Sequence, residues 1–310
     1  MNRRRCISIL AGSGAAALTG CRRPGGAPAT RWHGVLFNAE VDLAVQDLPR
    51  EEAQGLIERC VAEMQRLERI FSLYVPDSVL CTLNQDGRIA NAPAEFVALV
   101  EEALSIARKT GGVFDPTVQP YWVWLREAVE SGRGVEAGER ARRLALVDYR
   151  RVWVSGPEVR FEKPAMGMTL NGIAQGWITD RVCELLREAG AEHCLVNLGE
   201  FFAIGPQRSG ADWQVGLRGA GDAEVVALRE RALAVSSGAG LFFGRGEGMN
   251  HLIDPHSGRC AEDRRLVAVT AADACTADAL STACAVLGDE EARGLVRKWK
   301  DATLRILRPV

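Results

Sequence analysis

The sequence lacks three features, and each absence argues against a class of protein or site. Its 38 Lys and Arg residues nearly balance its 40 Asp and Glu residues, giving a formal net charge of −2 and a pI near 6.2. This balance argues against a nucleic-acid partner, because such binding uses a basic patch. No apolar run reaches about 20 residues, so we expect no membrane-spanning helix in the mature chain. No Cys-x-x-Cys pair occurs, which argues against a zinc site.

The N-terminal residues have the composition of an export signal. Three arginines precede an apolar stretch from Ile7 to Leu18, and small residues precede Cys21. We therefore interpret residues 1–20 as a signal peptide, whose Arg3-Arg4 pair loosely resembles a twin-arginine signal. The segment "LTGC" resembles a bacterial lipobox, in which Cys21 becomes the lipidated first residue. A soluble exported protein, cleaved nearby by ordinary signal peptidase, is the alternative.

The residues after the signal divide into a tether and a folded domain. Residues 21–33 are rich in Pro, Gly and Ala, which predicts a flexible, lipid-anchored tether, and we expect the domain over residues 34–310. The seven cysteines after Cys21 are odd in number and widely spaced, so they do not resemble a disulfide framework. One disulfide among them is left open. Apolar neighbours predict that three of them are core residues: Cys183, Cys194 and Cys284.

Hydrophobic periodicity predicts a mixture of helices and strands. Residues 50–72 and 93–112 have the helical period, and the second of these segments ends in a Gly-Gly C-cap. Residues 34–47 and 194–198 have the pattern of strands. Helices and short strands alternate without a regular βαβ rhythm, and no internal repeat is visible. We therefore expect an α+β fold.

Residues 274–288, "ACTADALSTACAVLG", have the composition of a buried helix that carries a single carboxylate. At about 3.6 residues per turn, Asp278 and Thr282 lie on one helical face, where their oxygens are placed to share a ligand. The alternative is purely structural. In that case Thr276 caps the helix, and Asp278 interacts with the helix dipole from the first turn.

Seven segments then occur in a recognisable order. They are "FSLYVPDSVLCTLN", "TGGVFDPTVQPYWVWL", "TLNGIAQGWITDRVCELLREAG", "LVNLGEFFAIG", "AVSSG", "HLIDPHSGR" and "TADALSTACAVLG". Together they resemble the ApbE-like family, the bacterial FAD:protein FMN transferases, over about residues 34 to 308. The resemblance implies a two-lobed mixed fold with an FAD cleft between the lobes. It also implies Mg²⁺-dependent cleavage of FAD, with FMN attached through its phosphate to a threonine of a target flavoprotein and AMP released.

The resemblance also implies where such a protein works and with what partner. Family members are commonly exported lipoproteins, so we expect this chain at the periplasmic face of the bacterial inner membrane, anchored through Cys21. The expected acceptor is an exported or membrane flavoprotein of a respiratory or electron-transfer complex. The chain contains no "SGAT"-type acceptor sequence, so self-flavinylation is not expected.

The resemblance assigns a Mg²⁺ site to the side chains of Asp278 and Thr282 and to the backbone carbonyl of Gly172. Mg²⁺ prefers oxygen ligands and is often held by one or two carboxylates, with phosphates and water completing the octahedron. In-line attack on a diphosphate needs positioning and charge stabilisation. A carboxylate and a hydroxyl on one helical face suit that task, and Asp278 is accordingly also a catalytic candidate.

Other positions are implied to contact FAD. Val113, Phe114 and Asp115 belong to "VFDPT", which matches the family's "AFDPT" segment. For Asp115 the alternative is turn chemistry before Pro116. Tyr74 matches a position near the flavin nucleotide, where an aromatic ring can stack, and core packing is the alternative.

The remaining candidates are a histidine and the glycine-containing loop. His251 matches a family histidine at the cleft and is a catalytic candidate that orients phosphate or moves a proton, with a structural role as the alternative. Gly172 and Gly176 are expected to let the backbone approach the phosphates. Two implied FAD contacts depart from the family pattern, because Thr169 stands where Asp is common and Gln175 where Lys or Glu is common.

The primary interpretation is thus a Mg²⁺-dependent FAD:protein FMN transferase. An FAD diphosphatase, which would use water in place of the threonine and release free FMN and AMP, is one alternative. A non-catalytic FAD-binding lipoprotein, which would store or deliver FAD, is the other. The neutral residues Thr169 and Gln175 keep both alternatives open, because they change the charge around the diphosphate.

Overall fold

The computed structural model describes most of the chain: residues 29–36, 39–46, 48–217, 224–244 and 248–307. The expected signal peptide, Cys21 and the first part of the expected tether lie outside the described residues. Among the described residues, no helix combines the length and the apolar character that a membrane crossing requires.

A seven-stranded sheet forms the centre of the protein, and each pair of neighbouring strands is antiparallel. In spatial order the strands are β1 (Thr30–Leu36), β2 (Ala39–Val45), β6 (Cys194–Asn197), β7 (Phe201–Ile204), β10 (Arg231–Ser237), β11 (Leu266–Ala271) and β12 (Thr303–Leu307). Residues 34–47 were expected to form one strand, but their described part is divided between β1, which ends at Leu36, and β2, which spans Ala39–Val45. The pairing starts at Thr30 with Val45, so residues 30–33 lie in the sheet and not in the tether. Composition does not reveal this boundary, because the pairing partner of β1 sets it.

Side chains of the central strands alternate between two buried faces. Phe202 and Val267 pack in the larger hydrophobic core, whereas Phe201 and Leu266 pack in a smaller core on the opposite face. A hairpin of β8 (Trp213–Leu217) and β9 (Glu224–Leu228) contributes to the smaller core. Because both faces are covered, strands such as β7 are apolar at every position and lack the alternation of a half-exposed strand.

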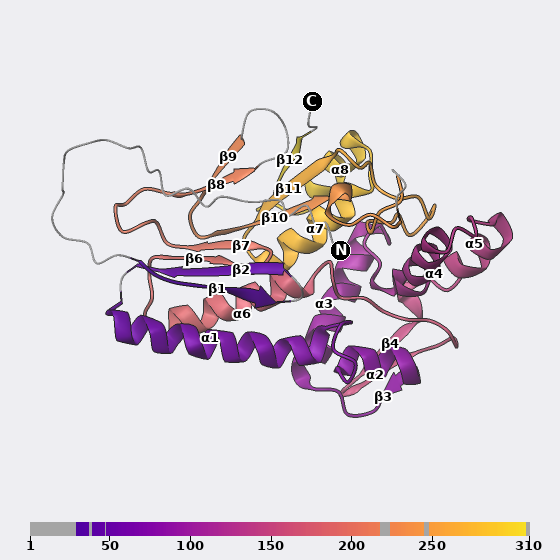
Figure 1. Ribbon diagram of the computed structural model, residues 1–310, viewed down its shortest axis with the longest axis horizontal. Helices are drawn as coiled ribbons and strands as arrows, with labels where there is room; N and C mark the ends of the chain where they lie inside the picture. Colours follow the sequence, from indigo (N-terminus) through magenta and orange to yellow (C-terminus); the bar gives the residue numbers. More distant parts are fainter. Residues whose placement is uncertain (1–28, 37–38, 47, 218–223, 245–247, 308–310) are drawn as a thin grey trace.

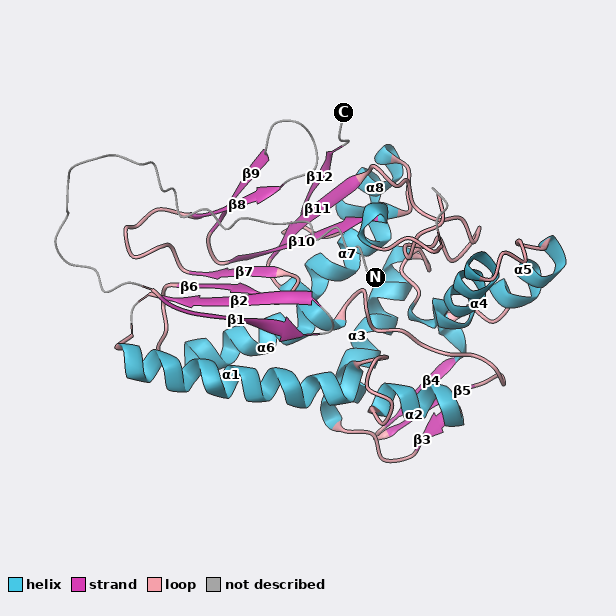
Figure 2. Ribbon diagram, in the orientation of Figure 1, coloured by secondary structure: helices cyan, strands magenta, loops and turns pink. Residues whose placement is uncertain are grey.

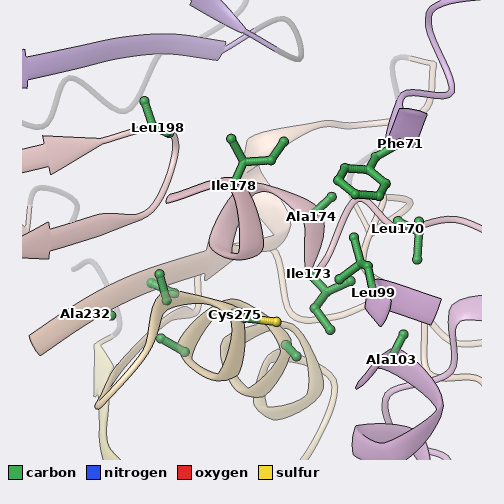
Figure 3. Close-up of a cluster of buried hydrophobic side chains, with 14 of the residues drawn as sticks. Phe71, Leu99, Ala103, Leu170, Ile173, Ala174, Ile178, Leu198, Ala232 and Cys275 are labelled. Carbon is green, nitrogen blue, oxygen red and sulfur yellow. The ribbon is translucent and has the colours of Figure 1, made fainter. Parts of the chain in front are cut away.

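Helices α1 (Arg50–Phe71), α6 (Ala174–Glu188) and α7 (Ala274–Ala285) fill the larger core together with α3 (Ala94–Thr110). Figure 3 shows Ile173, at the start of α6, between Cys275 of α7 and Leu99, with Phe71 on the side of Ala174. The helical periods of residues 50–72 and 93–112 are confirmed by α1 and α3. Each of these helices buries one apolar stripe.

Between α1 and α6 the chain forms a second group of elements beside the main sheet (Figures 1 and 2). This group contains α2 (Val79–Asp86), β3 (Arg88–Ile89), α4 (Gln119–Glu130), α5 (Ala137–Leu144), β4 (Val152–Ser155) and β5 (Glu158–Phe161). Strands β3, β5 and β4 form a small antiparallel sheet. The chain ends with α8 (Asp289–Val296) before β12. The segregated helices and antiparallel strands confirm the α+β class.

None of the seven cysteines in the described part of the chain forms a disulfide. Cys183, Cys194 and Cys284 are fully buried, which confirms them as core residues.

Candidate active site

A cavity of about 280 Å³ lies between the main sheet with its helices and the segment that leads into α4. The sequence indicated ten catalytic, FAD-contacting or metal-binding residues, and nine of them line this cavity. These are Val113, Phe114, Asp115, Thr169, Gly172, Gln175, His251, Asp278 and Thr282.

Tyr74, the tenth residue, lies beside the cavity and not in its wall. It is 53% exposed, so core packing does not explain this aromatic residue. Its hydroxyl accepts a hydrogen bond of 3.4 Å from Nδ2 of Asn171, which itself lines the cavity, as does the neighbouring Leu73. The ring therefore stands at the rim.

Helix α7 presents Asp278 and Thr282 to the cavity. The helix begins at Ala274, and Asp273 is its N-cap, because the Asp273 side chain accepts a hydrogen bond of 2.7 Å from the backbone N–H of Thr276. The alternative in which Thr276 caps the helix is therefore wrong. Asp278 lies in the second turn and is only 4% exposed, so a surface interaction with the helix dipole does not account for it.

The start of α6 packs directly against α7 and orients Asp278. The backbone N–H of Gly176 donates a hydrogen bond of 3.1 Å to Oδ2 of Asp278. A Cβ at position 176 would overlap the backbone of Ala274, so the two helices can approach this closely only at a glycine. Gly176 thus serves helix packing and orients Asp278, and it is not among the residues that line the cavity.

Gly172 lies against the second oxygen-bearing side chain of α7. A Cβ built at position 172 would stand 3.0 Å from Oγ1 of Thr282 and 3.1 Å from its Cγ2. The backbone of the "TLNGIAQG" loop and the Thr282 hydroxyl are therefore neighbours in the cavity wall.

Glu200 is a buried cavity residue that the family resemblance did not indicate. It is 7% exposed, and within the described residues its Oε2 has no hydrogen-bond partner. The backbone N–H of Val235 donates a hydrogen bond to the carboxylate. Burial, reinforced by the nearby charge of Asp278, raises the pKa of Glu200 well above its usual value. The available signal was a single acidic residue between the apolar segments "CLVNLG" and "FFAIG".

The cavity wall holds two buried acidic groups, Asp278 and Glu200. Burial raises the pKa of Asp278 as well, against the opposing effect of the hydrogen bond from Gly176. No Lys or Arg side chain is found among the described residues that line the cavity. Two buried carboxylates without a cationic partner are costly, and a dinucleotide diphosphate would add further negative charge. A bound cation would offset the charge of the carboxylates and also that of the diphosphate.

The donor atoms fit a hard divalent cation. The cavity wall contains the carboxylates of Asp278 and Glu200, the hydroxyl of Thr282 and the backbone of Gly172, and such oxygens are the ligands that Mg²⁺ prefers. The unpartnered Oε2 of Glu200 is a buried acceptor that a cation, or its bound water, would satisfy. No cluster of three or more His, Cys, Asp or Glu side chains suited to a metal occurs in the described part of the chain. Mg²⁺ does not require one, because phosphate and water complete its shell.

The carboxylate of Asp115 serves a local turn. Oδ1 accepts hydrogen bonds from the backbone N–H of Thr117 at 2.8 Å and from its hydroxyl at 2.6 Å, and Oδ2 accepts one from the backbone N–H of Tyr149 at 3.0 Å. Burial outweighs these bonds and raises the pKa of Asp115. Asp115 is thus the N-cap of the 3₁₀ helix Pro116–Val118, as the turn alternative proposed, and it also lines the cavity.

The two substituted positions form hydrogen bonds within the protein. Oγ1 of Thr169 accepts a hydrogen bond of 3.2 Å from the backbone N–H of Asn171. Nε2 of Gln175 donates to the backbone carbonyl of Leu198 at 3.1 Å. The amide of Gln175 occupies the space where a Cβ at Gly199 would lie. Gln175 therefore holds the turn between β6 and β7, directly before Glu200.

His251 lines the cavity with a neutral ring. Its Nδ1 lies 3.3 Å from the backbone carbonyl of Leu241. Burial lowers the pKa of His251, and that carbonyl offsets the effect only in part. When Nδ1 carries the proton and donates to Leu241, Nε2 is left as a hydrogen-bond acceptor. Because the ring is neutral near pH 7, Nε2 can act as a general base and take a proton from a reacting group.

Curated relatives resemble the chain over most of its length. The FAD:protein FMN transferase of Treponema pallidum is 30% identical over 276 residues, which cover 81% of this chain and 76% of the relative. The FAD:protein FMN transferase of Vibrio cholerae is 28% identical over 251 residues, which cover 76% and 75%.

Solved structures share the fold. The flavin transferase ApbE from Vibrio cholerae superposes with a TM-score of 0.76 at 23% identity, covering 91% of this chain and 94% of that one. The ApbE protein from Thermotoga maritima superposes with a TM-score of 0.78 at 24% identity, covering 91% and 97%. The model of the ApbE family matches residues 34–306. This chain therefore belongs to the ApbE family.

Proposed function

We propose that the protein transfers the FMN part of FAD to a threonine of an exported or membrane flavoprotein, in a Mg²⁺-dependent reaction that releases AMP. Family membership and the relatives named FAD:protein FMN transferase support flavin transfer to protein. The observation that carries the finer proposal is the cavity. Its buried carboxylates have no Lys or Arg among their described neighbours in the wall, so a cation is needed before a diphosphate can enter.

In this proposal Asp278, Thr282 and the carbonyl of Gly172 hold the cation. Bound Mg²⁺ would supply positive charge that offsets the charge on the diphosphate oxygens. Helix α7 keeps the carboxylate and the hydroxyl on one face. The hydrogen bond from Gly176 fixes the orientation of the Asp278 carboxylate, so little reorganisation is needed when the substrate arrives.

The acceptor hydroxyl has to lose its proton as it attacks. The threonine oxygen forms a bond to the phosphorus of the FMN half, and the bond from that phosphorus to the oxygen of AMP breaks. We assign proton acceptance to Nε2 of His251, because the neutral ring has its other nitrogen directed at Leu241. Val113, Phe114, Thr169, Gln175 and Tyr74 are proposed to contact FAD along the wall and rim.

The proposed location is the periplasmic face of the inner membrane, with the chain anchored through Cys21. The sequence features that support this location are the arginine-led apolar segment and "LTGC". An acceptor in a respiratory or electron-transfer complex would meet the enzyme there.

Covalent flavin on an acceptor is the direct test. The protein is co-expressed with candidate exported flavoproteins, and the denatured acceptors are inspected on a gel for flavin fluorescence. We expect fluorescence in one acceptor, a mass increase equal to FMN, and loss of both when the acceptor threonine is changed to valine. Mg²⁺-loaded enzyme that labels no acceptor would contradict the transferase proposal.

FAD hydrolysis is the second candidate function, and the hydrogen bond of Gln175 is the observation that supports it. Because the Gln175 amide is bound to Leu198, the position offers no charge to the diphosphate. Incubation with FAD and Mg²⁺ without acceptor separates the candidates. Rapid release of AMP over many turnovers indicates a diphosphatase, slow release indicates the transferase, and unchanged FAD on long incubation, with or without acceptor, indicates a non-catalytic FAD carrier.

A further inference from the structure

Glu200 is held in place by a rigid turn beside the cavity. The turn between β6 and β7 is closed by a hydrogen bond of 3.0 Å from the backbone N–H of Leu198 to the carbonyl of Glu200. Gly199 has a φ of +100°, a conformation that favours glycine. Gln175 binds the Leu198 carbonyl from the start of α6. The backbone that carries Glu200 is therefore held by contacts within the protein.

The protein itself does not satisfy this carboxylate. The Val235 backbone N–H donates to it, but Oε2 is buried and has no partner among the described residues. Leaving a buried polar oxygen unpaired costs free energy, and native structures rarely retain one without a purpose. The missing partner has to come from the cavity that Glu200 lines.

The groups that face Glu200 identify the kind of partner. Asp278 is the charged neighbour whose negative charge acts on Glu200, and Asp115 and His251 are the other titratable residues of the described cavity wall. The oxygens of Asp115 already accept three hydrogen bonds, and the His251 ring is neutral. An anion or a neutral ligand would not allow both acids to be ionised side by side. A cation would, because its charge offsets theirs.

We propose that Glu200 is a second carboxylate of the cation site, and that Asp278 and Glu200 together bind a divalent cation before FAD enters. This inference rests on the proposed Mg²⁺-dependent function and extends it to the order of binding. A site with one carboxylate depends on the phosphate oxygens of the nucleotide, whereas a second carboxylate raises affinity for the free ion. Glu200 contacts the cation directly or through a bound water, and it holds the cation in the empty cavity.

Cation affinity without nucleotide tests the proposal. Mn²⁺ is titrated into the full chain, with no FAD present, and free Mn²⁺ is measured by electron paramagnetic resonance. We expect the wild type to bind one ion and Glu200→Gln to weaken binding at least about tenfold. Glu127→Gln, which removes an exposed carboxylate on α4, is the matched control and should bind as the wild type does. With FAD present the loss in Glu200→Gln should be smaller, because phosphate oxygens then contribute.

Thermal unfolding shows whether Glu200→Gln weakens cation binding itself or merely destabilises the fold. Without metal, Glu200→Gln should melt at or above the wild-type temperature, because it removes an unpaired buried carboxylate. With Mg²⁺ alone the wild type should gain stability, and the variant should gain clearly less. Glu200→Asp, which keeps the charge, should retain part of the cation affinity.

Two results would overturn the inference. One is a wild-type protein that binds no Mn²⁺ until FAD is added, and the other is Glu200→Gln that binds free Mn²⁺ like the wild type. Neither result depends on flavin transfer. Failure of the transferase proposal would appear separately, as metal-loaded enzyme that leaves every acceptor unlabelled.

Discussion

Asp180, which is partly buried, and Glu200, which is buried, are carboxylates close to α7, but within the described residues the protein satisfies both oxygens of Asp180 and not both of those of Glu200. Asp180, on α6, accepts hydrogen bonds from the backbone N–H groups of Ala274 and Cys275 at 2.7 and 2.9 Å. It lies in a groove outside the cavity and fixes the start of α7. Glu200 lies inside the cavity and has one oxygen without a partner among the described residues.

The difference separates carboxylates that hold the fold from carboxylates that await a ligand. Asp115 belongs with Asp180, because the protein satisfies both of its oxygens. Asp278 belongs partly to each class, since Gly176 satisfies one oxygen while the residue still lines the cavity. Substitutions in the first class should mainly change stability. Substitutions in the second should mainly change metal binding and turnover.

Asp278→Ala should have the largest effect of the single substitutions. Loss of the proposed metal carboxylate should lower Mg²⁺-dependent turnover at least about 100-fold, because the metal supplies several kcal/mol of charge stabilisation. Stability should change little, since the variant loses one hydrogen bond but also a buried negative charge. Turnover assays paired with urea unfolding measure both effects. A variant that keeps its activity but loses much of its stability would place Asp278 with the structural carboxylates.

Asp180→Asn should show the opposite profile. Both oxygens of a carboxyl group can accept a hydrogen bond, even when it is protonated, whereas the NH₂ of Asn cannot, so one of the two backbone N–H groups would lose its partner. We therefore expect a loss of about 1–3 kcal/mol in the free energy of unfolding at pH 5. Glu184→Gln, an exposed change on the same helix that breaks an ion pair with Arg181, should cost less than about 1 kcal/mol. A large loss of cation affinity in Asp180→Asn with unchanged stability would contradict the division into two classes.

The pH dependence of Asp180→Asn sharpens the same test. Burial raises the pKa of Asp180 to about 7, above its value in the unfolded chain. The native state therefore holds more protons between about pH 4 and pH 7, and the contribution of Asp180 to stability falls as the pH rises through that window. Asn does not titrate, so the stability gap between the wild type and the variant should narrow from pH 5 to pH 8. A gap that widens over this range would overturn the assignment.

Gln175→Ala should have the smallest effect. It removes the hydrogen bond to the Leu198 carbonyl and loosens the turn that carries Glu200. One such bond is worth about 1 kcal/mol, so cation affinity without FAD should fall roughly fivefold. Gln54→Ala, on the exposed side of α1, is the control and should leave the affinity unchanged. An unchanged affinity in Gln175→Ala would show that the turn is held by other contacts.

Much of the site was visible in the sequence because its residues lie in short, ordered segments. Asp278 and Thr282 are four residues apart on one helix, so helical geometry alone places them on the same face. The residue that caps α7 was harder to predict from the sequence. Asp273 and Thr276 are both good caps, and only the backbone conformation at the start of α7 assigns the role to Asp273. Helices α4 and α5 had no pattern that marked them in advance.

By itself, the sequence determined the family, the α+β class, the amphipathic helices and the helical face that carries the oxygen pair. These properties follow from local order and periodicity, which a linear chain records. Tertiary structure alone decided that Gly176 is a packing contact, that Gln175 braces a turn and that Glu200 faces the same cavity as Asp278. Each of these depends on segments far apart in the chain meeting at short range, and neither spacing nor composition records such a meeting.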